Sequence, residues 1–94
     1  MTTHATFSTN AVAAITQVSP DEINGRALNR RATLARAMVY RVLRDRYAYT
    51  GGQISKLLGR DPANVCRALQ MVDGLVGHDK GVTNVWADVW KQVN

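Results

Sequence analysis

The sequence QISKLLGRDPANVCRALQMV, residues Gln53 to Val72, contains two short helical patterns with a turn signal between them. Its apolar residues recur at three- and four-residue steps on both sides of the run from Gly59 to Pro62. Gly59 can adopt the left-handed conformation that ends a helix, Asp61 can cap the next helix, and Pro62 fits a first helical turn. The segment therefore predicts a helix-turn-helix.

The second helix of this pair has polar residues on the side away from its apolar stripe. If Val65, Leu69 and Val72 face inward, a rotation of about 100° per residue turns other side chains outward. These side chains are Ala63, Asn64, Arg67 and Gln70. Arginine can pair with guanine, asparagine or glutamine with adenine, and alanine can contact a thymine methyl group. They are candidates for reading bases, although a plain helical hairpin with a solvated surface has the same pattern.

The positive charge is concentrated around this segment. The chain has 94 residues and a net charge of +5, but the stretch from Arg26 to Arg67 holds ten basic residues and two acidic ones. Such a distribution indicates a face that meets a polyanion, with a solvated basic face as the alternative. A membrane surface is less favoured, because the stretch lacks a Trp/Phe-rich apolar face. The candidate phosphate contacts are Arg30, Arg31, Arg41, Lys56 and Arg60.

The length and the remaining composition favour a binding module over an enzyme. Ninety-four residues suffice for one domain with a modest core. We find no nucleophile-base pair, no paired carboxylates and no metal-ligand cluster, so we expect no catalytic activity, no cofactor and no metal. Cys66 is expected to be a buried structural thiol, and His4 and His78 are isolated. No apolar run approaches the ~20 residues of a membrane span, and we expect a cytoplasmic protein.

The rest of the chain predicts further helices and no strands. Residues 1–9 are expected to be a flexible lead, with residues 10–94 forming the domain. A helix is expected from Thr9 or Asn10, a short one after Ser19-Pro20, and a long one from about Asn29 to Tyr47. Asn24-Gly25 and the run from Tyr47 to Gly52 are expected to be turns. The predicted fold is all-α, with five or six helices.

Aromatic residues on the long and last helices allow two interpretations. The apolar stripe of the segment Val82 to Val93 includes Trp86 and Trp90, which either cap the core or form a homodimer or partner interface. Tyr40, Tyr47 and Tyr49 could stack on bases, but packing at the edge of the core is favoured.

The order of these features resembles the C-terminal DNA-binding domain of the bacterial replication initiator DnaA. The resemblance covers about Asn10 to Val93 and rests on VSPDEI, GRALNRRATLARAMVYRVLRD, ISKLLGRD and PANVCRAL. It implies that Arg36 reaches a minor groove and that Asp61 belongs to the base-contacting set. Arg60-Asp61 match the start of the family's Arg-Asp-His-Thr-Thr motif, whereas Pro62, Ala63 and Asn64 replace the rest. A different DNA target is therefore expected.

Together these features predict sequence-specific binding of double-stranded DNA, in the control of replication or transcription. The alternative is a protein-interaction module that acts on a host replication or transcription protein through the last helix.

Overall fold

The computed structural model describes residues 3–94, and the regular secondary structure in that range is entirely helical. The helices are α1 (Thr3–Thr16), α2 (Pro20–Asn24), α3 (Arg30–Tyr47), α4 (Gly51–Leu58), α5 (Pro62–Leu75) and α6 (Lys80–Val93). The prediction of an all-α fold with five or six helices is thus confirmed for these residues. None of the helices in the described range is long and apolar enough to cross a membrane.

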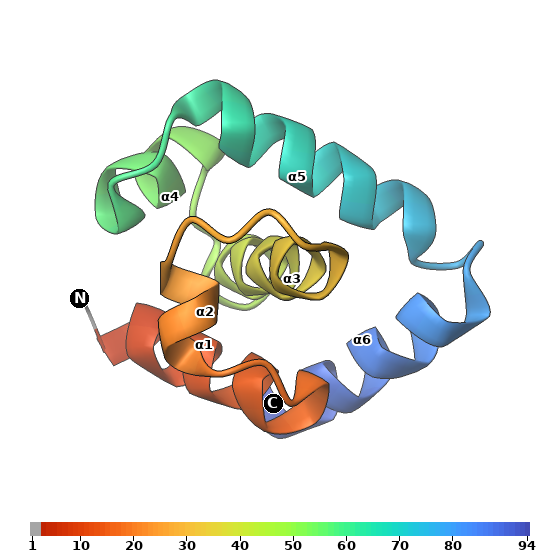
Figure 1. Cartoon of the computed structure of the whole chain (residues 1–94). Helices are drawn as coiled ribbons and strands as arrows, with labels where there is room; N and C mark the ends of the chain where they lie inside the picture. The colour runs from red at the N-terminus through yellow and green to blue at the C-terminus, as the bar shows by residue number, and fades with distance from the viewer. Residues whose placement is uncertain (1–2) are drawn as a thin grey trace.

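Helix α3 lies at the centre, with the other helices arranged around it (Figure 1). It packs against all five of them, most extensively against α5 and α1. Three alanines of α3, Ala32, Ala35 and Ala37, are completely buried. Such small side chains let neighbouring helices approach closely, and Met38 and Leu43 fill the space between them. A long alanine-rich helix can therefore form the core of a small domain.

Most of the predicted helix boundaries are confirmed by capping hydrogen bonds. The Ser19 side chain accepts from the backbone N–H of Glu22 at 3.2 Å, as expected for the start of α2. Asn29 caps α3 by accepting from the N–H of Ala32 at 2.9 Å. Helix α2 stops at Asn24-Gly25 and α3 ends at Tyr47, as the sequence indicated.

The first helix begins earlier than predicted. It starts at Thr3 rather than at Thr9 or Asn10, so residues 3–9 belong to α1 and not to a separate lead. Met1 and Thr2 lie outside the described residues. The early part of α1 is held by contacts that periodicity does not predict, because Ala5 and Ser8 are small buried residues. In addition, the His4 ring stacks on Tyr47 at 4.0 Å between ring centroids.

Gly51 and Gly52 were expected to belong to a turn, and they form the start of α4 instead. Helix α4 begins at Gly51 because Thr50 and Gln53 form a complete capping box. The Thr50 side chain accepts from Gln53 N at 3.1 Å, and the Gln53 side chain accepts from Thr50 N at 2.9 Å. This reciprocal cap compensates for the poor helix propensity of glycine in the first turn.

The aromatic residues of α3 and α6 serve the core. Trp86 is 9% exposed, and it lies on the same buried stripe of α6 as Val82, Val89 and Val93. Trp90 is partly buried and packs against this core. Tyr40 is buried, and Tyr47 and Tyr49 lie at the edge of the core, as the favoured interpretation predicted.

Candidate nucleic-acid interface

Helices α4 and α5 are joined by the tight turn that the sequence predicted. Gly59 has a φ of +63°, in the left-handed region that glycine tolerates best. The N–H of Arg60 donates to the carbonyl of Ser55 at 2.9 Å, and the buried Ser55 hydroxyl donates to the carbonyl of Arg60. Asp61 then caps α5 by accepting from the N–H of Ala63 at 2.7 Å. The start of α5 is therefore fixed to the end of α4 by hydrogen bonds within the turn.

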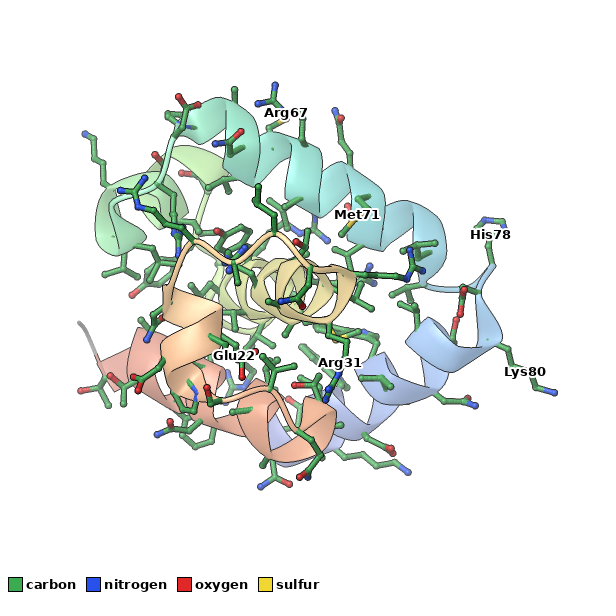
Figure 2. The ribbon with its side chains drawn as sticks, in the orientation of Figure 1. Glu22, Arg31, Arg67, Met71, His78 and Lys80 are labelled. Atoms are coloured by element: carbon green, nitrogen blue, oxygen red, sulfur yellow. The ribbon has the colours of Figure 1, made fainter. Side chains whose placement is uncertain are left out.

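The predicted outer face of α5 is exposed. Val65, Leu69 and Val72 are buried, and they turn a set of polar and small residues to the outside. That set is Ala63, Asn64, Arg67 and Gln70, all of them exposed. Arg67 points away from the body of the molecule (Figure 2) and donates to the Asn64 amide oxygen at 2.5 Å. Asp61 is exposed at the end of this face, but one of its carboxylate oxygens serves as the α5 cap.

A groove lies between α5 and the loop of residues 25–29 that connects α2 to α3. Its volume is about 670 Å³. Its lining includes four arginines, and no carboxylate from residues 3–94 contributes to it. Apolar side chains, among them Leu28 and Met71, stand between the charges, and Leu28 is 89% exposed. The arginines are Arg26, Arg36, Arg60 and Arg67, so the groove is strongly cationic.

Two of these arginines are anchored at the bottom of the groove. Arg36 donates through Nε to the carbonyl of Ile23 at 2.8 Å and through Nη2 to the carbonyls of Glu22 and Ala27, each at 3.1 Å. Arg60 donates through Nη2 to the carbonyls of Asn24 at 2.7 Å and Gly25 at 2.8 Å. These bonds satisfy carbonyls at the C-terminal end of α2.

This anchoring bears on the role that the resemblance implies for Arg36. An extended reach into a minor groove would break its three hydrogen bonds to the α2 end and the following loop. The exposed arginine of that loop is Arg26, which makes no hydrogen bond or ion pair with the described part of the chain. Sequence reasoning counted Arg26 as part of the basic stretch but did not assign it to the site.

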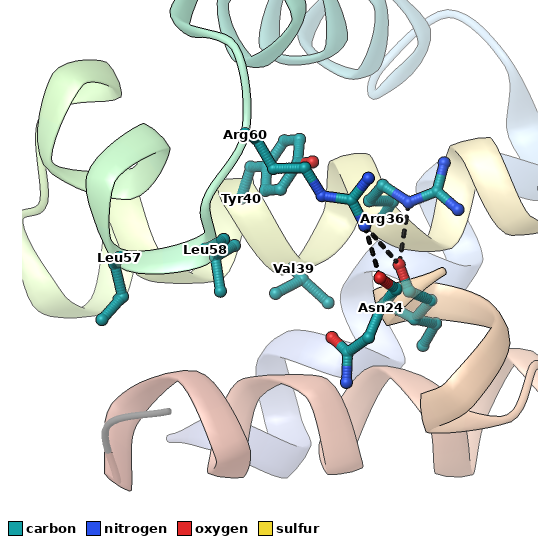
Figure 3. A pocket seen from close by; sticks show the side chains of 8 residues that line it. Asn24, Arg36, Val39, Tyr40, Leu57, Leu58 and Arg60 are labelled. Atoms are coloured by element: carbon teal, nitrogen blue, oxygen red, sulfur yellow. Dashed lines mark hydrogen bonds between the residues drawn. The ribbon is translucent and has the colours of Figure 1, made fainter. Parts of the chain in front are cut away.

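The two anchored arginines lie close together (Figure 3), and neither forms an ion pair with a carboxylate of residues 3–94. Burial lowers the pKa of Arg36, and the nearby charge of Arg60 lowers it further. Burial raises the pKa of Tyr40, while the positive charges of Arg60 and Arg36 act in the opposite direction. The bottom of the groove is thus a partly desolvated region of positive potential.

The basic residues in the second half of α3 have a different environment. Arg44 forms a bidentate pair with Asp73 of α5, at 2.7 and 2.8 Å, and Arg41 donates to the same carboxylate at 2.8 Å. Asp45 accepts from Arg44 Nε at 2.8 Å. Hydrogen bonds from Arg44 and the charges of both arginines lower the pKa of Asp73, although burial opposes them. Two carboxylates thus offset two guanidinium charges.

Arg41 was a predicted phosphate contact, and the structure gives it other partners. Besides its ion pair with Asp73, its guanidinium group lies over the Trp86 ring, 4.7 Å from the centroid. The sequence-based assignment did not foresee this, because Asp73 lies just outside the basic stretch and pairs across two helices.

The other predicted phosphate contacts divide into two groups. Arg31 donates to the carbonyls of Thr16 at 3.2 Å and Gln17 at 3.4 Å, so it also stabilises the end of α1. Arg30 and Lys56 are exposed and make no side-chain hydrogen bond or ion pair within the range that the structure describes. Arg30 and Lys56 can therefore meet an anion without losing an existing interaction.

The expectation that Cys66 is buried is wrong. Its thiol is exposed, because the neighbouring Val65 takes the inward position on α5 and Cys66 follows it by about 100° around the helix. His78 lies exposed in the loop before α6, and the His4 ring contacts Tyr47 and Tyr49. Over residues 3–94, no three His, Cys, Asp or Glu side chains come together in a way that could hold a metal ion.

Comparisons with known protein families, with curated proteins and with solved structures returned no match for this chain.

Proposed function

We propose that this protein binds double-stranded DNA by placing α5 in the major groove. The observation that carries the proposal is the continuity between the exposed α5 face and the cationic groove. Arg67 and Asn64 belong to both, since they lie on the outer face of α5 and also line the groove. A polyanion that lies along this groove would bring its bases to the same helix.

The residues of α5 have base-reading chemistry. Arg67 can donate two hydrogen bonds to guanine, Asn64 and Gln70 can pair with adenine, and Ala63 can contact a thymine methyl group. The hydrogen bond between Arg67 and Asn64 holds both side chains on the outer face in the free protein. On binding, both groups can exchange this bond for base edges. Asp61 would remain the α5 cap at the edge of the contact surface.

The phosphate contacts proposed here follow from the interactions of each basic residue. Arg30 and Lys56 are unpaired in the described chain, and Arg26 lies on the loop that forms the opposite wall of the groove. These three residues can bind phosphates without breaking internal bonds. Arg31 and Arg60 can contribute through nitrogen atoms that their carbonyl acceptors leave free. We no longer assign a phosphate to Arg41.

We further propose that the fold is DnaA C-terminal-domain-like and that the protein acts in replication or transcription control. The support is the sequence resemblance together with the order of a short α2, a long α3 and the α4-turn-α5 unit. The replacements Pro62, Ala63 and Asn64 lie at the exposed start of α5, where base contacts would be made. We therefore expect a target that differs from the DNA sequence recognised by the DnaA family, called the family's box below.

Random-site selection followed by competition binding tests this proposal. We expect one selected motif to bind at least about a hundredfold more tightly than random duplex at one fixed salt concentration. The family's box should exceed random duplex by less than about tenfold, or 1.4 kcal/mol, because a mismatched position typically costs ~1–3 kcal/mol. Failure to enrich any motif would contradict sequence-specific binding. Tight preference for the family's box would show that the replaced residues do not set the target.

The alternative of an interaction module based on α6 receives no specific support. The stripe that suggested it, including Trp86, is already buried against the core. Only Trp90 and Val85 of that stripe remain partly exposed, so the domain itself uses most of the apolar surface that a second copy or a partner would need.

A further inference from the structure

Tyr40 is a largely buried residue of α3 that also lines the cationic groove. The residue is 3% exposed, and its hydroxyl makes no hydrogen bond with any described residue. The hydroxyl oxygen itself keeps contact with solvent, because Tyr40 lines the open cationic groove. Nothing in the packing of α3 requires a hydroxyl at this position, since phenylalanine would fill the same volume.

The groups around this hydroxyl are donors and carry positive charge. Tyr40, Arg36 and Arg60 line the cationic groove and also a smaller cavity of about 210 Å³ behind it. Figure 3 shows the Tyr40 hydroxyl on the same side as the two guanidinium groups. The two arginines share an acceptor, the Ile23 carbonyl, which places them next to each other.

Both arginines keep donors that their anchoring bonds do not use. Nη1 of Arg36, and Nε and Nη1 of Arg60, make no hydrogen bond to residues 3–94. The carbonyl groups that hold the remaining nitrogens are neutral, so the two positive charges persist. Burial, and after it the repulsion between the two charges, lowers the pKa of Arg36. An anion at this point would pair the free donors and reduce the repulsion.

We propose that Tyr40, Arg36 and Arg60 form a phosphate-binding site at the bottom of the groove. A phosphate group suits it because it offers several acceptor oxygens to guanidinium and hydroxyl donors that come from different directions. In the DNA complex, which rests on the function proposed above, the occupant is a backbone phosphate of the strand that passes between α5 and the loop of residues 25–29. The base-reading residues Asn64 and Arg67 line the same groove, so this strand would lie next to the bases that they contact.

The first test is the variant Tyr40→Phe, which removes only the unpartnered hydroxyl. Tyr47→Phe is the matched control, because the Tyr47 hydroxyl also lacks a hydrogen-bond partner in the described chain and lies away from the groove. We expect Tyr40→Phe to weaken duplex binding about three- to tenfold, as for the loss of one typical hydrogen bond. The slope of affinity against salt should not change, because no charge is lost. Tyr47→Phe should match the unmodified protein.

Duplexes with a single neutral methylphosphonate locate the phosphate. At one position the substitution should weaken binding by the unmodified protein and have a smaller effect on Tyr40→Phe, since the two changes remove the same contact. At all other positions the two proteins should lose affinity equally. Equal losses at every position, with duplex binding intact, would overturn the site and leave the proposed DNA binding standing.

Titration with inorganic phosphate tests whether the site takes a DNA backbone phosphate or a free phosphate group. We would follow the arginine Nε–Hε NMR signals during titration with phosphate, with chloride at equal ionic strength as the control. Phosphate should shift the Arg36 and Arg60 signals in the unmodified protein and shift them less in Tyr40→Phe. If this occurs although no duplex binds, the proposed function fails and the site takes a free phosphate group. If neither duplex nor phosphate responds to Tyr40→Phe, the site does not exist.

Discussion

Helix α3 contributes to two arginine clusters, and they differ in what lies opposite their guanidinium groups. Towards the C-terminal end, Arg41 and Arg44 meet the Asp73 carboxylate at 2.7–2.8 Å. Towards the N-terminal end, Arg36 lies beside Arg60 in a groove that no carboxylate of the described residues lines. The two clusters consist of the same residue type, although Arg60 comes from the turn between α4 and α5 rather than from α3. Only the first is electrically offset within the protein.

This difference shows why the count of basic residues alone does not locate a nucleic-acid interface. A guanidinium group that already has a bidentate carboxylate must give up that partner before it can bind a phosphate, whereas one held by neutral carbonyls keeps its charge. The cluster whose charge is offset is Arg41 and Arg44 with Asp73, here called the offset cluster. We expect it to fix α5 against α3, and we expect Arg36 and Arg60 to meet the ligand. Binding and stability measurements can test this division between the clusters.

The largest expected effect is the dependence of DNA affinity on salt. If Arg26, Arg30, Arg31, Lys56 and the joint site of Arg36 and Arg60 supply about five phosphate contacts, the slope of log affinity against log salt should be roughly −4 to −5. Affinity should then fall several-hundredfold between roughly 50 and 200 mM salt. Fluorescence anisotropy with a labelled duplex measures the slope. A flat response would contradict DNA binding, and a slope steeper than about −6 would indicate that the offset cluster also contacts phosphates.

The next largest effect should separate Arg67 from Arg41. Arg67→Ala should cost about 1–3 kcal/mol on the selected motif and little on random duplex, because the lost contact is to a base. Arg41→Ala should leave both affinities nearly unchanged, since Arg41 is paired with Asp73 and lies over Trp86. Competition binding on both duplexes measures the effects. If Arg41→Ala weakens both duplexes and flattens the salt slope by about one unit, Arg41 does bind phosphate and the division between clusters is wrong.

The sequence predicted the helices well because each one has a local signal. The caps at Ser19, Asn29 and Asp61 and the left-handed Gly59 all follow from the chemistry of one or two residues. The start of α1 could not be predicted in this way. It depends on small buried residues and on a His4 ring that stacks on Tyr47, far along the chain.

The candidate site was predicted in part. Helical periodicity was sufficient to place Asn64, Arg67 and Gln70 on the outside of α5. The same periodicity indicates that Cys66 is exposed beside the buried Val65, whereas the general preference of cysteine for the interior predicts the opposite. The ion pairs of Asp73 and the unpaired Tyr40 hydroxyl depend on which helices pack together. No pattern within a single helix contains that information.

A smaller effect on duplex affinity is expected when Arg41 and Arg44 lose the Asp73 carboxylate. Asp73→Asn removes one of the two carboxylates that pair with Arg41 and Arg44 and leaves Asp45, so about one positive charge becomes available to phosphates. Random duplex should bind a few-fold more tightly, with a salt slope steeper by about one unit. Asp88→Asn is the matched control, because Asp88 is exposed on α6 and makes no ion pair within residues 3–94. Equal gains in both variants would reflect net charge alone and would contradict a specific release.

The smallest effect should appear in the pH dependence of stability. The hydrogen bonds from Arg44, followed by the charges of Arg44 and Arg41, lower the pKa of Asp73 in the folded protein, against the opposing effect of burial. Its contribution to the free energy of unfolding is therefore fully present above the unfolded pKa, about 3.9, and is lost as the pH falls through the lower folded pKa. The Asp73 side chain is 40% exposed, so solvent screening should keep this contribution below about 1 kcal/mol.

Urea unfolding of the unmodified protein and of Asp73→Asn, measured between about pH 7 and pH 2.5, tests this linkage. The unmodified protein should be more stable at neutral pH, and the difference should shrink as the pH falls below about 4. The reason is that protonation removes the negative charge of Asp73, which then resembles the uncharged amide of the variant. Asp88→Asn should show no such convergence, since the Asp88 carboxylate has no ion-pair partner in the described chain. A difference between the unmodified protein and Asp73→Asn that stays constant over the whole range would mean that the ion pair with Arg41 and Arg44 does not stabilise the fold, and that the offset cluster is not a clamp between α3 and α5.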